Sequence, residues 1–205
     1  MALKALGLNC TLSRSPKPSS TQKMLDQILQ ALATHGVEGD SQRVVDLDIK
    51  PGVSHDEGDG DEWPALRQRV MAADILIVAT PIWMGQPSSV AKRVVERMDA
   101  IFGDIGKDGR YPTFDKVGVV AVVGNEDGAH HVTAELYQAL ADVGYSIPGG
   151  SSAYWVGEAM SDTDYQDLAE TPKKVADTIT TLASNAAHLA KVLKANSYPA
   201  PLKGN

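Results

Sequence analysis

Short runs of apolar residues alternate along the chain with segments in which apolar residues recur at helical spacing. Residues 75–79 (ILIVA) and 116–123 (KVGVVAVV) are apolar almost throughout, as in parallel strands that are covered on both faces. In residues 22–34 the apolar side chains instead fall on one face of a helix. The pattern therefore predicts both buried strands and amphipathic helices.

The predicted strands and helices follow one another in nearly strict alternation. Strands are predicted at residues 4–8, 43–47, 75–79, 116–123 and 145–147, the last continued around 152–155. Helices are predicted at residues 22–34, 62–73 and 90–102, after the loop 124–131 as far as about 143, and at 172–195. About five strand–helix repeats predict an α/β fold with right-handed crossovers and a parallel sheet covered by helices on both sides.

Length and cysteine content limit the domain organisation and the compartment. The 205 residues are long enough to bury a substantial core, and we expect one domain at 1–196 followed by a mobile tail at 197–205. Cys10 is the single cysteine, so no intrachain disulfide is available, which fits a reducing compartment. The chain shows neither an apolar run of membrane-span length nor a signal-peptide pattern, and a cytoplasmic location is expected.

The charge pattern excludes some classes of partner. A net charge of −7 argues against a general nucleic-acid binder, which usually carries a basic face. The acidic segment 56–62 lacks the fixed ligand spacing of a calcium loop. It is interpreted as a solvated loop, and no metal site is predicted.

Three informative loops each follow a predicted strand, at residues 9–21, 80–89 and 124–131. The carboxyl ends of parallel strands meet at one edge of a sheet, and ligands bind there where the strand order reverses. If these strands are central, the three loops form a single site.

The first loop, NCTLSRSPKPSST, is rich in hydroxyl groups and leads into a helix. Free amides at a helix N-terminus and rotatable hydroxyls suit a phosphate, although the serines and the threonine before the helix also suit a simple cap. The loop matches neither G-x-x-x-x-G-K-[ST] nor G-x-G-x-x-G, which argues against a P-loop hydrolase and a dinucleotide-binding Rossmann site. The candidate phosphate ligands are Thr11, Ser13, Ser19, Ser20 and Thr21.

The other two loops suit a flat ring. The second loop, TPIWMGQPSS, places Trp83 where it would pack against a ring, or alternatively plug the space beneath the loop. The third loop, GNEDGAHH, offers backbone amides that can donate to ring carbonyls or to a ring nitrogen.

With these motifs in this order, the chain resembles the flavodoxin-like NAD(P)H-dependent flavin reductases, in particular the multimeric flavodoxin and quinone reductase branch, over residues 3–150. The resemblance implies a doubly wound sandwich with a five-stranded parallel sheet in the order 2-1-3-4-5, FMN as cofactor and NAD(P)H as electron donor. The residues that it implies for FMN binding are Thr11, Ser13, Ser19, Ser20, Thr21, Pro81, Ile82, Trp83, Met84, Gly85, Asn125, Glu126, Asp127 and Gly128.

The chain departs from the family pattern at several positions. Cys10-Thr11 stands where Gly-Ser is common, and the longer first loop leaves the role of Arg14 open. Glu126 and Asp127 would disfavour an anionic reduced flavin, so we expect them to face solvent or to cap the following helix. The pair formed by His130 and its neighbour is interpreted either as a proton donor or as a helix-start feature, and no catalytic residue is assigned with certainty.

Three functions are weighed from the resemblance. The first is an FMN-dependent oxidoreductase that passes hydride or electrons from NAD(P)H to a quinone, a flavin or a similar small acceptor. The second is a flavodoxin-type electron carrier without nicotinamide activity; a third is an interaction protein that has lost the cofactor. A homodimer or homotetramer is expected, partly from the aromatic stretch 153–156, with no nucleic-acid or membrane partner.

Overall fold

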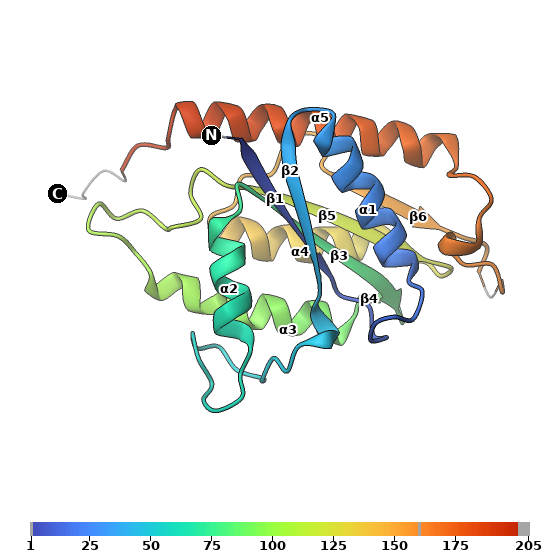
Figure 1. The fold of residues 1–205 in the computed structure, drawn as a ribbon, viewed down its shortest axis with the longest axis horizontal. Helices are drawn as coiled ribbons and strands as arrows, with labels where there is room; N and C mark the ends of the chain where they lie inside the picture. The colour runs from blue at the N-terminus through green and yellow to red at the C-terminus, as the bar shows by residue number, and fades with distance from the viewer. Residues whose placement is uncertain (1, 160, 201–205) are drawn as a thin grey trace.

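The computed structural model describes residues 2–159 and 161–200 and shows a sheet between two layers of helices (Figure 1). The strands are β1 (Leu3–Asn9), β2 (Val37–Arg43), β3 (Ile75–Trp83), the short β4 (Gln86–Pro87), β5 (Val117–Gly124) and β6 (Ser152–Val156). The helices are α1 (Ser20–Ala33), α2 (Trp63–Ala72), α3 (Ser89–Met98), α4 (Ala129–Asp142) and α5 (Lys173–Ala195). Three 3₁₀ turns lie at Val44–Asp46, Asp99–Gly103 and Tyr165–Asp167.

The sheet has the order and direction expected of a flavodoxin-like fold. Its five parallel strands run β2-β1-β3-β5-β6, and β4 pairs antiparallel with the end of β3. This is the predicted order 2-1-3-4-5 once β4 is set aside as a hairpin partner. The predicted fold class is therefore confirmed.

The two faces of the sheet carry separate hydrophobic cores. One core packs α1 and α5 against side chains such as Ile75 and Val119, and the other packs α2, α3 and α4 against side chains such as Leu76 and Val120. Successive residues of a strand point to opposite faces, so a strand covered on both sides must be apolar at every position. This explains why the central strands β3 and β5 were the clearest in the sequence.

The sequence pattern misplaced the second strand and placed the last one only in part. The second strand is Val37–Arg43, a polar segment at the sheet edge, whereas the predicted 43–47 segment forms the Val44–Asp46 turn. An edge strand needs little apolar surface, so β2 can be polar. The apolar Val44 is buried although it lies in the turn that follows the strand. Of the predicted last strand, residues 145–147 make only one isolated bridge, from Ser146 to Val117, whereas the continuation predicted around 152–155 is confirmed as β6.

The segment that follows α5, up to residue 200, lies near the amino ends of the central strands, opposite the tips of the strand arrows (Figure 1). Tyr198 donates its backbone N–H to Asp115 at 2.7 Å, and its hydroxyl lies 2.9 Å from that of Ser146. The start of the predicted tail is thus held, and residues 201–205 lie outside the described residues. No helix in the described part of the chain has both the length and the apolar character to cross a membrane.

Candidate functional site

A cavity of about 300 Å³ opens where β1, β3 and β5 end. Ser20, Trp83 and Asn125, one from each of the three loops, line it together. The convergence expected from the strand order therefore occurs. The volume lies at the lower end of the roughly 300–1,000 Å³ that is usual for small-molecule pockets.

Hydroxyl groups from the first loop and α1 form one wall of the cavity. All the predicted hydroxyl residues of this segment line it: Thr11, Ser13, Ser19, Ser20 and Thr21. Ser19 is also the N-cap of α1 and accepts a hydrogen bond from the Gln22 N–H at 3.2 Å. Ser19 is therefore both a helix cap and part of the cavity lining.

Asn9, at the end of β1, fixes the path of this loop. Its side chain is fully buried; the Oδ1 atom accepts from the Thr11 N–H at 3.0 Å, and the Nδ2 atom donates to Gln22 at 2.8 Å. Because both ends of the amide are bonded, the loop and the first turn of α1 are held in one arrangement. The sequence analysis did not single out this residue.

The two basic residues of the first loop face different places. Lys17 lines the cavity, and its backbone carbonyl accepts from Arg43 at 2.7 Å. Arg14 instead lines a separate cavity of about 240 Å³ beside Val44 and α3. Of these two basic residues, Lys17 alone lines the cavity that carries the hydroxyl groups.

The second loop is a tight β-hairpin. Pro81, Ile82 and Trp83 line the cavity, and the side chain of Trp83 is 54% exposed. Met84 and Gly85 form the two-residue turn, with φ of 53° and 72°, and do not line the cavity. Positive φ at both positions is the type I′ geometry that matches the twist of a hairpin.

The third loop locks this hairpin in place. Asn125 and Glu126 line the cavity, whereas Asp127 and Gly128 do not. Glu126 is half-buried and accepts from the Met84 N–H at 3.0 Å, whereas Asp127 is exposed and accepts from the N–H of Gly128, the N-cap of α4. Gly128, at φ 127°, packs so closely on the hairpin that a Cβ there would lie 2.8 Å from the Cα of Gly85.

A segment far along the chain completes the cavity. Residues 161–168, the strap, cross the first turns of α1 and contribute Asp164, Tyr165 and Gln166 to the lining. Trp155 of β6 lines it as well and packs on Tyr165 with ring centroids 5.5 Å apart. These residues carry no local motif, and the only pattern that included any of them was the aromatic stretch 153–156, which had been linked to assembly.

Polar groups of α1 hold the strap. Lys23 Nζ donates to the carbonyls of Tyr165, Gln166 and Leu168 at 3.0–3.2 Å. The Tyr165 hydroxyl donates to Gln27 at 2.6 Å, and burial raises the pKa of that phenol, which keeps it a neutral donor. Asn125 Nδ2 donates to the Ser161 carbonyl at 2.8 Å and ties the strap to the third loop.

The other candidate reactive groups lie outside the cavity. His130 Nε2 is 3.1 Å from the Tyr154 hydroxyl, on the exposed outer side of β6, and does not line the cavity. Cys10 is fully buried, and burial raises the pKa of its thiol far above the ordinary value, which disfavours the thiolate. Neither residue is positioned by the structure to act on a ligand in this cavity.

Comparisons with known proteins agree with this architecture. The model of the family described as NADPH-dependent FMN reductase matches residues 3–161. The 8-demethyl-8-aminoriboflavin-5'-phosphate synthase of Streptomyces davaonensis is 35% identical over 213 residues, covering 99% of this chain and 83% of the relative. The crystal structure of RosB with the bound intermediate 8-demethyl-8-formylriboflavin-5'-phosphate has a TM-score of 0.87 at 35% identity, covering 96% of this chain and 82% of that one.

Two further matches carry less information on function. A protein of Mycobacterium bovis named divalent metal cation transporter MntH is 37% identical over 206 residues, but this chain spans only 30% of its length. The apo structure of the NADH:FMN oxidoreductase EMOB has a TM-score of 0.67 at 18% identity, covering 98% of this chain and 97% of that one, which supports the fold alone. Because the family model matches most of the chain and a relative is similar over nearly its full length, the chain belongs to the NADPH-dependent FMN reductase family.

Proposed function

We propose that this chain binds FMN in the cavity between its three loops and passes electrons from NAD(P)H to a small acceptor such as a quinone or a flavin. The observation that carries the proposal is the composition of one cavity, with hydroxyl groups and a helix N-terminus on one wall and Trp83 on another. Hydroxyls and amides suit a phosphate monoester, and an indole suits a flat ring.

The donor set of the cavity fits FMN. Ser13, Ser19, Ser20 and the amides at the start of α1 supply donors for the phosphate, and Lys17 adds a positive charge. The carboxylates that line the cavity, Glu126 and Asp164, are drawn partly away from the ligand by their own hydrogen bonds within the protein. A phosphate therefore meets donors on the wall formed by the first loop and α1.

The protein's part in this chemistry is to bind and orient. FMN, when bound, supplies the centre that accepts hydride from the nicotinamide and returns electrons to the acceptor. Trp83, on its locked hairpin, would pack against the ring and limit the access of water. Such chemistry requires no nucleophile, which agrees with the burial of Cys10.

The spectrum of the purified protein tests the proposal. We expect a yellow protein, or a colourless one that takes up FMN, with flavin absorption bands and steady oxidation of NADH or NADPH in the presence of a quinone. The variant S20A should bind FMN about tenfold more weakly because it removes one donor to the phosphate. A protein that takes up no FMN would contradict the proposal, and one that binds FMN but oxidises neither nicotinamide would be a carrier.

A second function is favoured by one specific observation. The relative from S. davaonensis is similar over nearly the whole chain and is named as a synthase of a modified riboflavin phosphate. On this view the flavin is substrate, and the same cavity holds it for modification. Mass spectrometry of the flavin recovered after turnover separates the two functions, because an electron-transfer cofactor returns with unchanged mass.

A further inference from the structure

The middle of the first loop, residues 14–18, is exposed although the loop forms one wall of the cavity. Asn9 fixes the loop where it begins, and Ser19 caps the helix where the loop ends. Within the middle stretch one backbone hydrogen bond is described, from the Lys17 N–H to the Arg14 carbonyl at 3.1 Å. An exposed stretch with so few bonds of its own needs support from elsewhere to hold one conformation.

Arg43, the last residue of β2, supports this stretch. The parallel register pairs Arg43 with Asn9, so its backbone lies beside the point where the loop begins. Its half-buried side chain donates from Nη1 to the Lys17 carbonyl at 2.7 Å and, over the longer distance of 3.4 Å, to the Ser13 carbonyl. One guanidinium group therefore links the two ends of the stretch.

Asp46, in the turn that follows β2, supports the same stretch through Ser15. Its Oδ1 atom accepts from the Ser15 N–H at 2.9 Å, and its Oδ2 atom accepts from Ser15 Oγ at 2.6 Å. The bond from the Ser15 hydroxyl is the main reason that the pKa of this carboxyl lies below its ordinary value, so Asp46 is ionised at neutral pH. Hydrogen bonds to an ionised carboxylate are stronger than those between neutral groups.

Neither Arg43 nor Asp46 lines the cavity, so an effect of either residue on binding has to pass through the loop or through its charge. A loop that is already ordered loses less conformational entropy when it closes on a ligand, and the ligand binds more tightly. A carboxylate beside a phosphate site, in contrast, repels the phosphate. At Asp46 the two effects therefore have opposite signs and can be told apart.

We propose that Arg43 and Asp46 are positioning residues that preorganise the first loop for the phosphate of the bound flavin. The proposal rests on the proposed function, since it requires FMN in the cavity. It gives the polar end of the edge strand β2 and the turn after it a part in binding, although neither of them contributes a residue to the cavity lining.

The experiment measures dissociation constants by flavin fluorescence for FMN and for riboflavin, which lacks the phosphate. D46A removes both bonds to Ser15 together with one negative charge, whereas S15A removes only the bond from the hydroxyl and changes no charge. D48A is the matched control. It removes an equal charge at an exposed position two residues along the chain, where the Asp48 side chain makes no hydrogen bond with the described residues.

We expect D46A to bind FMN about tenfold more weakly, roughly the cost of ordering one residue, and riboflavin as well as the wild type does. S15A and R43M should weaken the binding of FMN in the same selective way, and D48A should bind FMN at least as tightly as the wild type.

A second measurement needs no ligand. Hydrogen exchange of the Lys17 N–H, followed by NMR, should be faster in D46A than in the wild type. The partner of that N–H is the Arg14 carbonyl, which the substitution does not remove, so faster exchange reports a looser loop.

Tighter binding of FMN by D46A, as the loss of a repelling charge alone would produce, overturns the proposal for Asp46. So does unchanged binding, an equal loss for FMN and riboflavin, or a loss of the same size in D48A. Arg43 is judged by R43M in the same comparison of the two flavins. If D46A does not fold, S15A decides, because Ser15 is exposed and uncharged. A wild-type protein that binds neither flavin would instead contradict the proposed function together with this inference.

Discussion

Ser88 joins the two loops that begin the site. Its Oγ donates to the Cys10 carbonyl at 2.6 Å and accepts from the Ala91 N–H at 3.1 Å as the N-cap of α3. S88A should lower the free energy of unfolding by about 2 kcal/mol, because it removes a cap and leaves a buried carbonyl unpaired. The melting temperature should fall by about 4–8 °C. The neighbouring S89A, at an exposed position, is the control and should change stability by less than about 0.5 kcal/mol.

Met84 occupies a backbone conformation that suits other residues better. Its φ is 53° and its side chain is 88% exposed, so no packing compensates for the strain. Asn-Gly is the preferred pair in a type I′ turn, and M84N should therefore raise the free energy of unfolding by about 0.5–1 kcal/mol. M84A keeps the strain and should show no such gain in chemical denaturation. Equal stability of both variants would contradict a strained turn.

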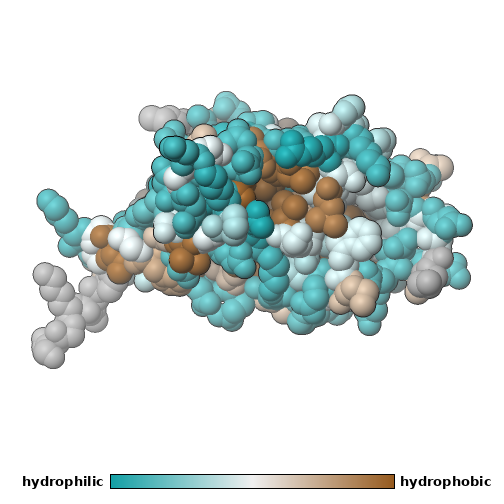
Figure 2. Space-filling view, turned by 90° about the horizontal axis from the view of Figure 1, so that it is seen from below, coloured by the Kyte–Doolittle hydropathy of each residue, from teal (hydrophilic) through white to brown (hydrophobic). Residues whose placement is uncertain are grey.

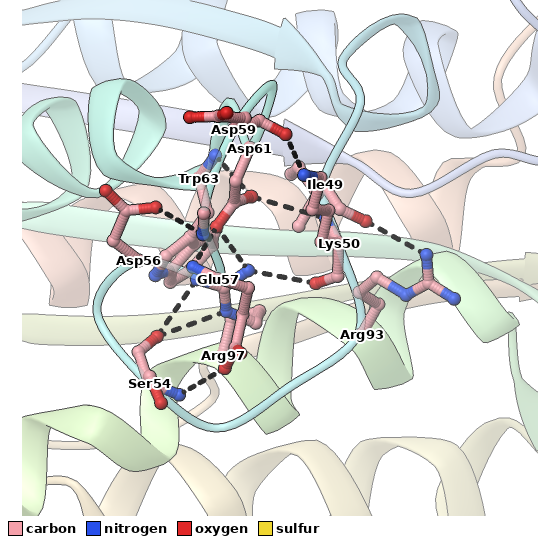
Figure 3. Close-up of polar contacts among 11 residues, drawn as sticks. Ile49, Lys50, Ser54, Asp56, Glu57, Asp59, Asp61, Trp63, Arg93 and Arg97 are labelled. Carbon is pink, nitrogen blue, oxygen red and sulfur yellow. Dashed lines mark hydrogen bonds and ion pairs between the residues drawn. The ribbon is translucent and has the colours of Figure 1, made fainter.

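Two arginines of α3 contact the segment between β2 and α2. Arg93 donates to the Ile49 carbonyl at 2.9 Å, and Arg97 makes the larger set of contacts (Figure 3). Arg97 of α3 is fully buried; it pairs with Asp61 at 2.8 Å and donates to the carbonyls of Lys50 and Ser54, each at 2.9 Å (Figure 3). Figure 2, which views the molecule from the side of α2 and α3, shows hydrophobic side chains gathered near the middle of this face. One acidic residue of the segment that was interpreted as solvated, Asp61, is therefore buried and paired with a buried cation, which charge counting along the sequence did not predict.

This ion pair predicts a pH dependence of stability. Burial alone would raise the pKa of Asp61, but hydrogen bonds from Glu57, Arg97, Trp63 and Lys50 outweigh it and lower the pKa to about 2. A carboxyl whose folded pKa lies below its ordinary value of 3.8 adds stability above that value. That stability is lost as the pH falls from about 4 towards 2.

D61N removes the titrating group and leaves Arg97 buried without its counter-charge. We expect it to lower the free energy of unfolding at pH 7 by about 3–5 kcal/mol and to flatten the dependence of stability on pH between about 2 and 4. Denaturant titrations at several pH values measure both effects. D59N, at an exposed acidic position in the same segment, should leave the profile unchanged.

At the level of elements, apolar runs predicted the fold well where both faces of a strand are covered. They failed at β2, whose sequence VEGDSQR is polar because an edge strand is held by backbone pairing with β1. They also missed β4, since two residues that pair only through a hairpin leave no period to detect. Helix positions were predicted closely because each helix buries one continuous apolar face.

For the whole molecule, the site was predictable only as far as local motifs reach. The three loops were found because each follows a buried strand, and the strand order brings their ends together. The strap and Trp155 were missed because their place at the cavity depends on contacts between α1 and residues more than a hundred positions later. Assembly as a homodimer or homotetramer stays a prediction, which sedimentation velocity would check.

The chain end provides a test of how far stability and binding are separated in this fold. Tyr198 bonds to Asp115 and lies edge-on to Phe114, with ring centroids 6.0 Å apart. Both partners precede β5, so these contacts lie at the amino ends of the strands, whereas the cavity lies at the carboxyl ends. Truncation after Asn196 should lower the melting temperature by about 3–6 °C, since two hydrogen bonds and an aromatic contact are lost. Truncation after Ala200 keeps these contacts and serves as the control. Both forms should bind FMN with wild-type affinity, because no group at the cavity is altered. A weaker affinity in the shorter form alone would show that contacts at the amino ends of the strands influence binding at their carboxyl ends.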